Sequence, residues 1–148
     1  MTQLEQHHTA EAPHEVIYTA KTHTTGGREN GVSRSSDGRL EIKLSPPGSL
    51  RIGTNPEQLF AAGWSACFEG AITLAAHRKK LKLPGDVAID AEVDLHLEYG
   101  EYFLSVRFTI LISGVEQSVA KALIHDAKRI CPYSKATSGN VAVTYDVA

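Results

Sequence analysis

The chain has 148 residues and a net charge of −2, and its longest run of basic residues is Arg78-Lys79-Lys80. This balance lacks the basic surface that nucleic acids or anionic membranes require. Its longest uncharged stretch, residues 58–68, is shorter than the roughly 20 residues of a membrane helix, and its N-terminus has no secretory pattern. We therefore expect one cytoplasmic domain, where two cysteines are more often catalytic, redox-active or metal-binding than a static disulfide.

The first 14 residues are polar and show no hydrophobic periodicity, although they include His7, His8 and His14. This composition is typical of a disordered leader, and a metal-binding tract is the weaker alternative. We expect residues 15–148 to form a single domain, because they contain no repeat and no linker.

Residues 15–44 alternate loosely between apolar and polar side chains, which indicates short β-strands. The expected strands cover residues 15–24, 32–36 and 40–44. The glycine-rich stretch TTGGRENG permits a tight connection after the first strand, and Arg28 is its only arginine. Asp37-Gly38 is a strong hairpin signal before the third strand.

A long helix is predicted over residues 55–81. Asn55 is a favoured N-cap, and Pro56 suits the first helical position. Apolar residues recur at helical spacing on more than one face, and Glu69 is the only charge in the central turns. A helix that is apolar nearly all round is buried, with other elements packed on several sides. Cys67 lies near its middle.

The cleanest pattern lies in the second half of the chain. Apolar side chains recur at every second position over residues 87–97, with polar residues between most of them, and residues 102–112 repeat this period of two. They predict two antiparallel strands with one buried face.

Ser113 and Glu116 resemble a capping box at the start of a second helix. This helix should stop at Cys131, because the residue before Pro132 is disfavoured in the α region. A last strand is expected over residues 141–147. The order of elements predicts an α+β fold, in which an antiparallel sheet packs on two helices and the first helix is central.

The two cysteines differ in their surroundings. Cys67 lies about three turns inside its helix, where the helix dipole cannot lower its pKa much, so a reactive thiolate needs a nearby cation or base. The simpler alternative is a small buried hydrophobic residue. Cys131, at a helix end, is expected to be mobile and partly exposed, which suits a resolving thiol; an inert residue is the alternative.

Other chemistries fit the residues less well. The two cysteines and seven histidines show no CxxC or HxxxH spacing for zinc. The chain has no GxSxG motif, and its glycine-rich loop lacks the lysine of a phosphate loop. Four histidines are expected to be exposed to solvent: His23, His77, His96 and His125.

Four sequence motifs occur together: TTGGR, SSDGRL, TNPEQLFAAGWSACF and CPYSKATSGNV. The combination resembles the organic hydroperoxide resistance proteins of the OsmC superfamily. The resemblance covers about residues 16–147, and the two motifs that carry cysteines are long and specific. The chain departs from the family at Trp64, where tyrosine is common, and in the loop PPGSLRIG, which has fewer glycines.

The resemblance implies an OsmC-like α+β fold and an intertwined homodimer whose active sites are built from both subunits. It implies a thiol peroxidase that reduces alkyl and fatty-acid hydroperoxides, with Cys67 as the peroxidatic and Cys131 as the resolving cysteine. Arg28 and Glu57 would be the activating pair. A dithiol, carried as a lipoyl group on a lipoylated protein, would regenerate the enzyme, and no metal, haem or flavin would be needed.

The residues themselves are compatible with these roles. The permanently charged guanidinium of Arg28 can stabilise the Cys67 thiolate, and Glu57 can hold the guanidinium through two hydrogen bonds. We also predict an apolar substrate surface beside the sulfur. It comprises Phe60, Trp64, Phe68 and Tyr133.

Two alternatives remain open at the level of sequence. A thioesterase of the hot-dog type also wraps a sheet around one long helix, but it would use a carboxylate or an asparagine and would not require cysteine. A redox sensor or small-molecule binding module would keep the thiols and turn over poorly.

Overall fold

The computed structural model describes residues 14–148, so the predicted leader lies outside the described residues except for His14. The order of elements is β1 (Thr22–Thr25), α1 (Gly27–Asn30), β2 (Val32–Ser35), β3 (Glu41–Lys43), α2 (Pro56–Arg78), β4 (Val87–Glu98), β5 (Glu101–Ile112), α3 (Gln117–Ile130), α4 (Pro132–Thr137) and β6 (Ala142–Val147). The α+β prediction is confirmed.

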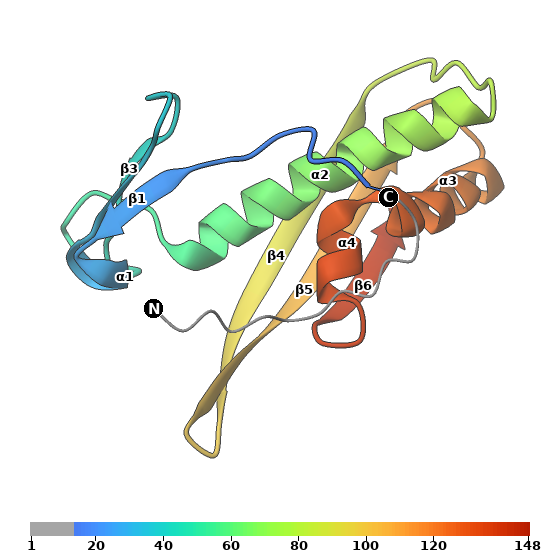
Figure 1. Ribbon diagram of the computed structural model, residues 1–148. Coiled ribbons are helices and arrows are strands. Elements are labelled where there is room, and N and C mark those ends of the chain that lie inside the picture. The colour runs from blue at the N-terminus through green and yellow to red at the C-terminus, as the bar shows by residue number, and fades with distance from the viewer. Residues whose placement is uncertain (1–13) are drawn as a thin grey trace.

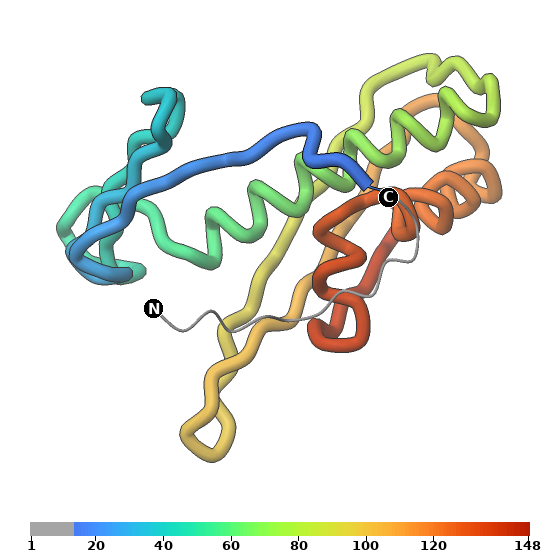
Figure 2. The backbone as a smooth tube through the Cα atoms, viewed as in Figure 1, coloured from blue at the N-terminus to red at the C-terminus, as the bar shows by residue number. Residues whose placement is uncertain are grey.

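The strands form two separate three-stranded sheets. One has the order β1-β2-β3 and the other β4-β5-β6. Figure 1 shows α2 reaching from the small N-terminal sheet across the second sheet, with α3 beside its C-terminal half and α4 near its middle. The backbone trace in Figure 2 shows the N-terminal sheet standing apart from the rest of the chain.

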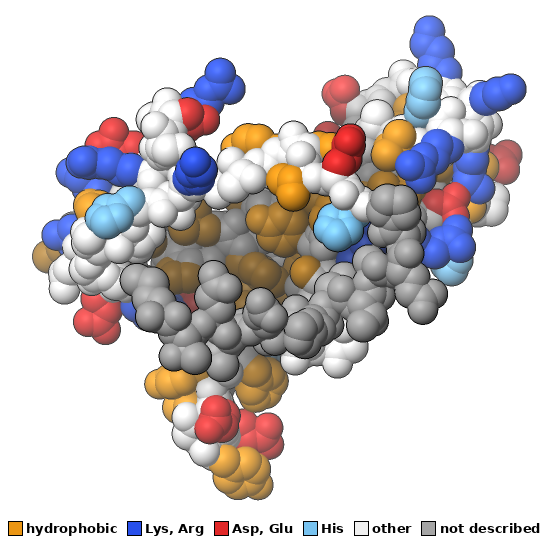
Figure 3. Space-filling model, viewed as in Figure 1, with side chains coloured by type: hydrophobic (Ala, Val, Ile, Leu, Met, Phe, Trp, Pro, Cys, Tyr) orange, Lys and Arg blue, Asp and Glu red, His pale blue; other side chains and the backbone are white. Residues whose placement is uncertain are grey.

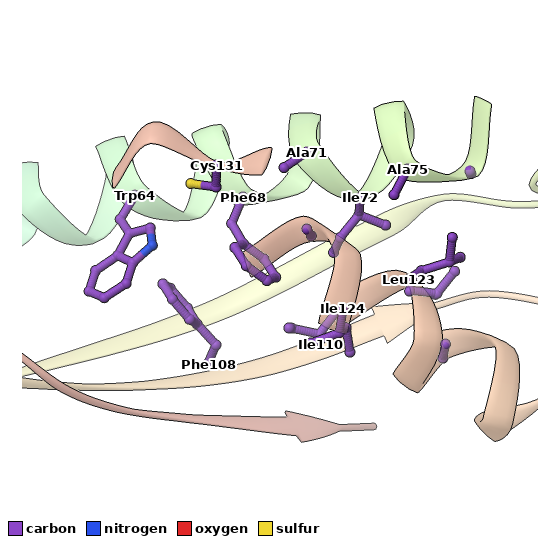
Figure 4. Close-up of a cluster of buried hydrophobic side chains, with 14 of the residues drawn as sticks. Trp64, Phe68, Ala71, Ile72, Ala75, Phe108, Ile110, Leu123, Ile124 and Cys131 are labelled. Carbon is purple, nitrogen blue, oxygen red and sulfur yellow. The ribbon is translucent and has the colours of Figure 1, made fainter. Parts of the chain in front are cut away.

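The helix α2 begins where the sequence predicts. The Asn55 side chain accepts a hydrogen bond from the Gln58 backbone N–H at 2.8 Å, and Pro56 occupies the first turn. One face of α2 then packs on β5 and α3 through fully buried side chains (Figure 4). Trp64 meets the ring of Phe108 edge-on, with 5.1 Å between centroids. Each such buried side chain contributes about 1.5–3 kcal/mol to folding.

The opposite face of α2 is left uncovered by residues 14–148. Ala62, Ala66, Gly70 and Leu74 are exposed there, so the prediction of burial on all sides does not hold for a single chain. By length and composition α2 could also cross a membrane, which the count of uncharged residues had missed. The core helix of a soluble protein passes the same test, and one face of α2 lies in such a core.

Several local predictions need correction. Residues 14–21 form no strand, because β1 begins only at Thr22. The predicted capping box is absent, since Glu116 is the N-cap of α3 and no side chain caps it. Ser113 instead lies in the preceding turn and donates its backbone N–H to Asp86.

The last strand, β6, pairs with β5 in parallel, whereas an antiparallel sheet was predicted. The cause is the connection: α3 and α4 together form a crossover that returns the chain to the starting end of β5. The turn between β4 and β5 agrees with the sequence, because Tyr99 and Gly100 both adopt positive φ, as a two-residue hairpin turn requires.

Candidate active site

The two cysteines meet although they are 64 residues apart. The Cys131 sulfur lies 3.2 Å from the Cys67 sulfur, and both thiols are free. A disulfide has an S–S length of about 2.05 Å, so a movement of little more than 1 Å would join them. Cys67 comes from the middle of α2, and Cys131 from the junction of α3 and α4.

Exposure separates the two thiols. Cys67 is partly exposed, whereas Cys131 is fully buried. The prediction that Cys131 is partly exposed is therefore wrong. Pro132 was interpreted as the end of a helix, but it also begins α4, and α4 folds back over Cys131. A molecule from solvent can reach only the Cys67 sulfur.

Burial raises the pKa of the Cys67 thiol above its ordinary value, and the neighbouring Cys131 adds to this rise. The backbone N–H of Tyr133, in the first turn of α4, acts in the opposite direction because it donates toward the sulfur. Within one chain the rise dominates. A cation from elsewhere is needed to make Cys67 a thiolate at neutral pH.

Two contacts hold α4 against α2. The indole Nε1–H of Trp64 donates a buried hydrogen bond of 3.0 Å to the Ser134 hydroxyl. The ring of Tyr133 lies over Gly63, where a Cβ would come within 2.8 Å of its hydroxyl oxygen. The same short helix carries Cys131 at its start, so these contacts set the distance between the two sulfurs.

The predicted activating pair is present. The Arg28 guanidinium donates to the Glu57 carboxylate at 2.7 Å, through one nitrogen rather than the predicted two. This bond lowers the pKa of Glu57 and raises that of Arg28, so both stay charged at neutral pH. Gly26 and Gly27, with φ of 78° and 67°, form the turn that directs Arg28 toward α2.

The pair does not reach Cys67 of its own chain. Glu57 and Cys67 are ten residues apart on one straight helix, which separates them by about 15 Å along its axis. Arg28 is also absent from the groups that shift the pKa of Cys67. Within one chain, the Arg28–Glu57 pair and the thiols therefore lie at two different places along α2.

An open cavity of about 350 Å³ lies beside the Arg28–Glu57 pair. Its other walls are mostly apolar and come from the loop before α2, from α2 and from β4: Pro47, Asn55, Gln58, Ala61, Ala91, Val93 and Leu95. Sequence reasoning missed this lining, because the alternation of β4 assigns these side chains to a closed core. The length of β4 was the one indication in the sequence, because a 12-residue strand extends beyond the part of the sheet that α2 can pack against.

The predicted aromatic surface is correct only in part. Trp64 and Phe68 are fully buried against Phe108 and belong to the core, so their assignment to a substrate surface is wrong. Phe60 is partly exposed two turns before Cys67, and Tyr133 is 41% exposed beside it. These two remain available to a ligand.

No group of three metal-ligating side chains occurs within residues 14–148. Three of the four named histidines are exposed as predicted. His96 is the exception: it is partly buried, its Nε2 lies 2.7 Å from the Ser105 hydroxyl, and its ring stacks on Phe103. His96 thus serves β4–β5 pairing.

Comparison with known proteins connects this geometry to a family. The OsmC-like protein family matches residues 46–146, a range that contains both cysteines and Glu57. The chain belongs to the OsmC-like family. An organic hydroperoxide resistance protein of Xanthomonas axonopodis pv. citri is 45% identical over 141 residues, which is 93% of this OsmC-like chain and 99% of that protein.

Solved structures support the same assignment. An organic hydroperoxide resistance protein from Legionella pneumophila aligns with a TM-score of 0.84 at 40% identity, covering 90% of this chain and 99% of its own. The OhrB protein of Bacillus subtilis aligns equally well at 36% identity, covering 90% of this OsmC-like chain and all of its own. The predicted family and its fold are therefore confirmed.

The contact between Trp64 and Ser134 makes a prediction about this OsmC-like site. Ser134→Ala removes the acceptor that holds α4 on α2, so Cys131 should lie less often within reach of Cys67. We expect formation of the Cys67–Cys131 disulfide with a mild oxidant to slow about fivefold, the equivalent of about 1 kcal/mol. Quenched alkylation and mass spectrometry would measure the rate.

Ser65→Ala is the matched control, because among residues 14–148 the Ser65 hydroxyl bonds only to the Ala61 and Ala62 carbonyls within α2. It should leave the rate unchanged. Equal rates for Ser134→Ala and the parent chain would show that this hydrogen bond does not position the thiols.

Proposed function

We propose that this protein is a cysteine-dependent peroxidase that reduces organic hydroperoxides to alcohols and protects a cell against them. The observation that carries the proposal is the thiol pair: an accessible Cys67 sulfur lies 3.2 Å from a fully buried Cys131 sulfur. The relatives are named organic hydroperoxide resistance proteins, which supports the same class of substrate. The activity belongs in the cytoplasm, where dithiol reductants are maintained.

In the first step the Cys67 thiolate attacks the terminal oxygen of the hydroperoxide. The O–O bond breaks, the alkoxide leaves and takes up a proton to become an alcohol, and Cys67 becomes a sulfenic acid. Arg28 is suited to this step, because a guanidinium can stabilise both the thiolate and the charge on the departing oxygen.

In the second step the Cys131 thiol attacks the sulfenic acid, which releases water and forms the Cys67–Cys131 disulfide. Because Cys131 is buried beside its target, it is protected from oxidation until this step. An external dithiol, best supplied as the lipoyl group of a lipoylated protein, then reduces the disulfide by thiol–disulfide exchange and becomes a disulfide itself. The chemistry requires no metal, haem or flavin.

A homodimer would complete the site. Two copies of α2 running antiparallel and crossing near residue 62 would bring Glu57 of one copy level with Cys67 of the other. Ala62 and Ala66 on the exposed face allow a close approach. The small sheet β1–β3 points to the same arrangement, because Leu50 and Ile52 after it are almost fully exposed. Short isolated strands need further cover to be stable.

The roles of the two cysteines can be separated. Cys67→Ser should abolish peroxide consumption, whereas Cys131→Ser should allow one turnover and then oxidation of Cys67 to the sulfinic acid. Mass spectra after a few equivalents of peroxide would show the species. If peroxide consumption survived in Cys67→Ser, the proposed Cys67-dependent peroxidase mechanism would be wrong. Hydrolysis of a thioester substrate by the same variant would favour the thioesterase alternative.

Sharing of the site between two copies gives a complementation test. Arg28→Ala and Cys67→Ser should each be inactive alone. When the two variants are co-expressed, half of the dimers are mixed, and each mixed dimer holds one complete site, so about a quarter of the parent activity should return. Co-expressed Cys67→Ser and Cys131→Ser form the control, since these two groups act within one chain and no site is restored. No recovery in the first mixture would contradict the shared site.

The cavity beside Arg28 predicts a substrate preference. Each buried methylene of an alkyl hydroperoxide contributes about 0.8 kcal/mol, so a four-carbon tail could add about 3 kcal/mol at full burial. We expect kcat/KM for an alkyl or fatty-acid hydroperoxide to exceed that for hydrogen peroxide at least about tenfold, allowing for partial burial. The rates are compared at saturating dithiol.

Leu95→Ala, in the cavity wall, should reduce this preference, whereas Leu111→Ala, on the outer face of β5, should not. Equal rates for the two peroxides in the parent protein would remove the cavity from the account of substrate choice.

A further inference from the structure

A second cavity of about 420 Å³ lies between α2, α3 and α4, on the side of the thiols away from the Arg28–Glu57 pair. Its floor is Ala75 and Ile130, and its rim carries four cations and one carboxylate: Arg78, Lys79, Arg129, Lys135 and Asp126. Figure 3 shows Lys and Arg side chains gathered over this end of α2 and α3.

The cations outnumber the carboxylate by three, since four positive charges face one negative charge. Asp126 forms ion pairs with Lys79 at 3.2 Å and with Arg129 at 2.8 Å, and both lower its pKa. Arg78 and Lys135 form no ion pair with any residue from 14 to 148. Each cation lies near a helix end, where the dipole favours it, but this preference does not explain why three helices direct their cations at one cavity.

The cavity is close to the redox pair. Ile130 immediately precedes Cys131, and the Lys135 backbone N–H donates to the Cys131 carbonyl at 3.1 Å. Arg78 lies three turns beyond Cys67 on the same face of α2, about 16 Å along the axis. An anionic surface bound here would face the thiols within the reach of a long side chain that carries a dithiol.

We propose that this basic cavity, Arg78–Lys79–Arg129–Lys135, is the docking site for an acidic surface of the protein that carries the reducing dithiol. The proposal rests on the proposed function, because only a thiol peroxidase needs such a reductant. The chain as a whole has a charge of −2 and would repel an acidic protein, so a local charge of +3 would select one orientation of approach.

In that orientation the carrier's first thiolate attacks the exposed Cys67 sulfur, and Cys131 leaves as a thiolate and takes up a proton. The carrier's second thiol then attacks the mixed disulfide, which releases Cys67 and leaves the carrier oxidised. Docking affects only the encounter, so it changes the rate with a protein-borne dithiol and leaves the rate with a free dithiol unaltered.

The test compares two reductants of identical chemistry in the full-length protein. One is free dihydrolipoamide, and the other is a dihydrolipoyl group on an acidic protein domain. For Arg78→Glu/Arg129→Glu we expect kcat/KM for the domain to fall at least about tenfold, with no change for free dihydrolipoamide. In the parent protein, added salt should slow the domain-borne reaction alone.

Lys82→Glu/Lys121→Glu is the matched control, since it makes the same change of net charge at exposed positions outside the cavity. It should retain the parent rate with both reductants. For the neutral variant Arg78→Gln/Arg129→Gln, kcat/KM with the domain-borne dithiol should lie between the values of the parent and the charge-reversed variant. An unchanged thermal unfolding temperature would show that each variant is folded.

An equal loss with both reductants would overturn the proposal, because the cavity would then support the thiols or the fold. No loss with either would overturn it as well. If the parent protein consumed no hydroperoxide with free dihydrolipoamide, the proposed function itself would fail. Calorimetric titration of the acidic domain into the parent and the charge-reversed variant would then still decide whether the cavity binds it.

Discussion

The packing of α3 and α4 on one face of α2 is the constraint on which the rest of this structure depends. It buries Cys131 completely, leaves Cys67 accessible and places their sulfurs 3.2 Å apart. The hydrogen bond from Trp64 to Ser134 belongs to this interface, and the same indole packs edge-on against Phe108 of β5. The packing of the core also sets the geometry of the two thiols, so a change that loosens the core must affect the distance between the sulfurs.

A second constraint is the straightness of α2. The helix carries Glu57 in its first turn and Cys67 ten residues later, so the thiol and its predicted activating cation are held about 15 Å apart in one chain. Burial raises the pKa of Cys67, and Arg28 of the same chain does not offset this rise. An antiparallel second copy, as proposed above, would bring Arg28 near Cys67 and would cover the exposed face of α2, so assembly and activation of the thiol would occur together.

The two ends of α2 would then serve different molecules. Near its start, the Arg28–Glu57 pair borders an apolar cavity that suits the tail of a hydroperoxide. Near its end, a basic cavity suits an acidic protein. The hydroperoxide and the reductant would thus approach the same two sulfurs from different sides. Because the two cavities are separate, binding of one molecule would not block binding of the other. In the proposed cycle, the molecules that oxidise and reduce the thiols would bind at different ends of α2.

The sequence by itself determined the α+β class, the start of α2 at Asn55, the β4–β5 hairpin and the family, because each depends on local periodicity, capping or a contiguous motif. Only the tertiary structure decided the burial of Cys131, the existence of α4, the parallel pairing of β6 and the placement of Trp64 in the core. Each of these depends on which elements far apart in the chain pack together. A residue before proline can end one helix and begin another, and an apolar helical face can meet a core, a ligand or a second copy. Local sequence does not distinguish these outcomes, because they differ only in the neighbour that supplies the contact.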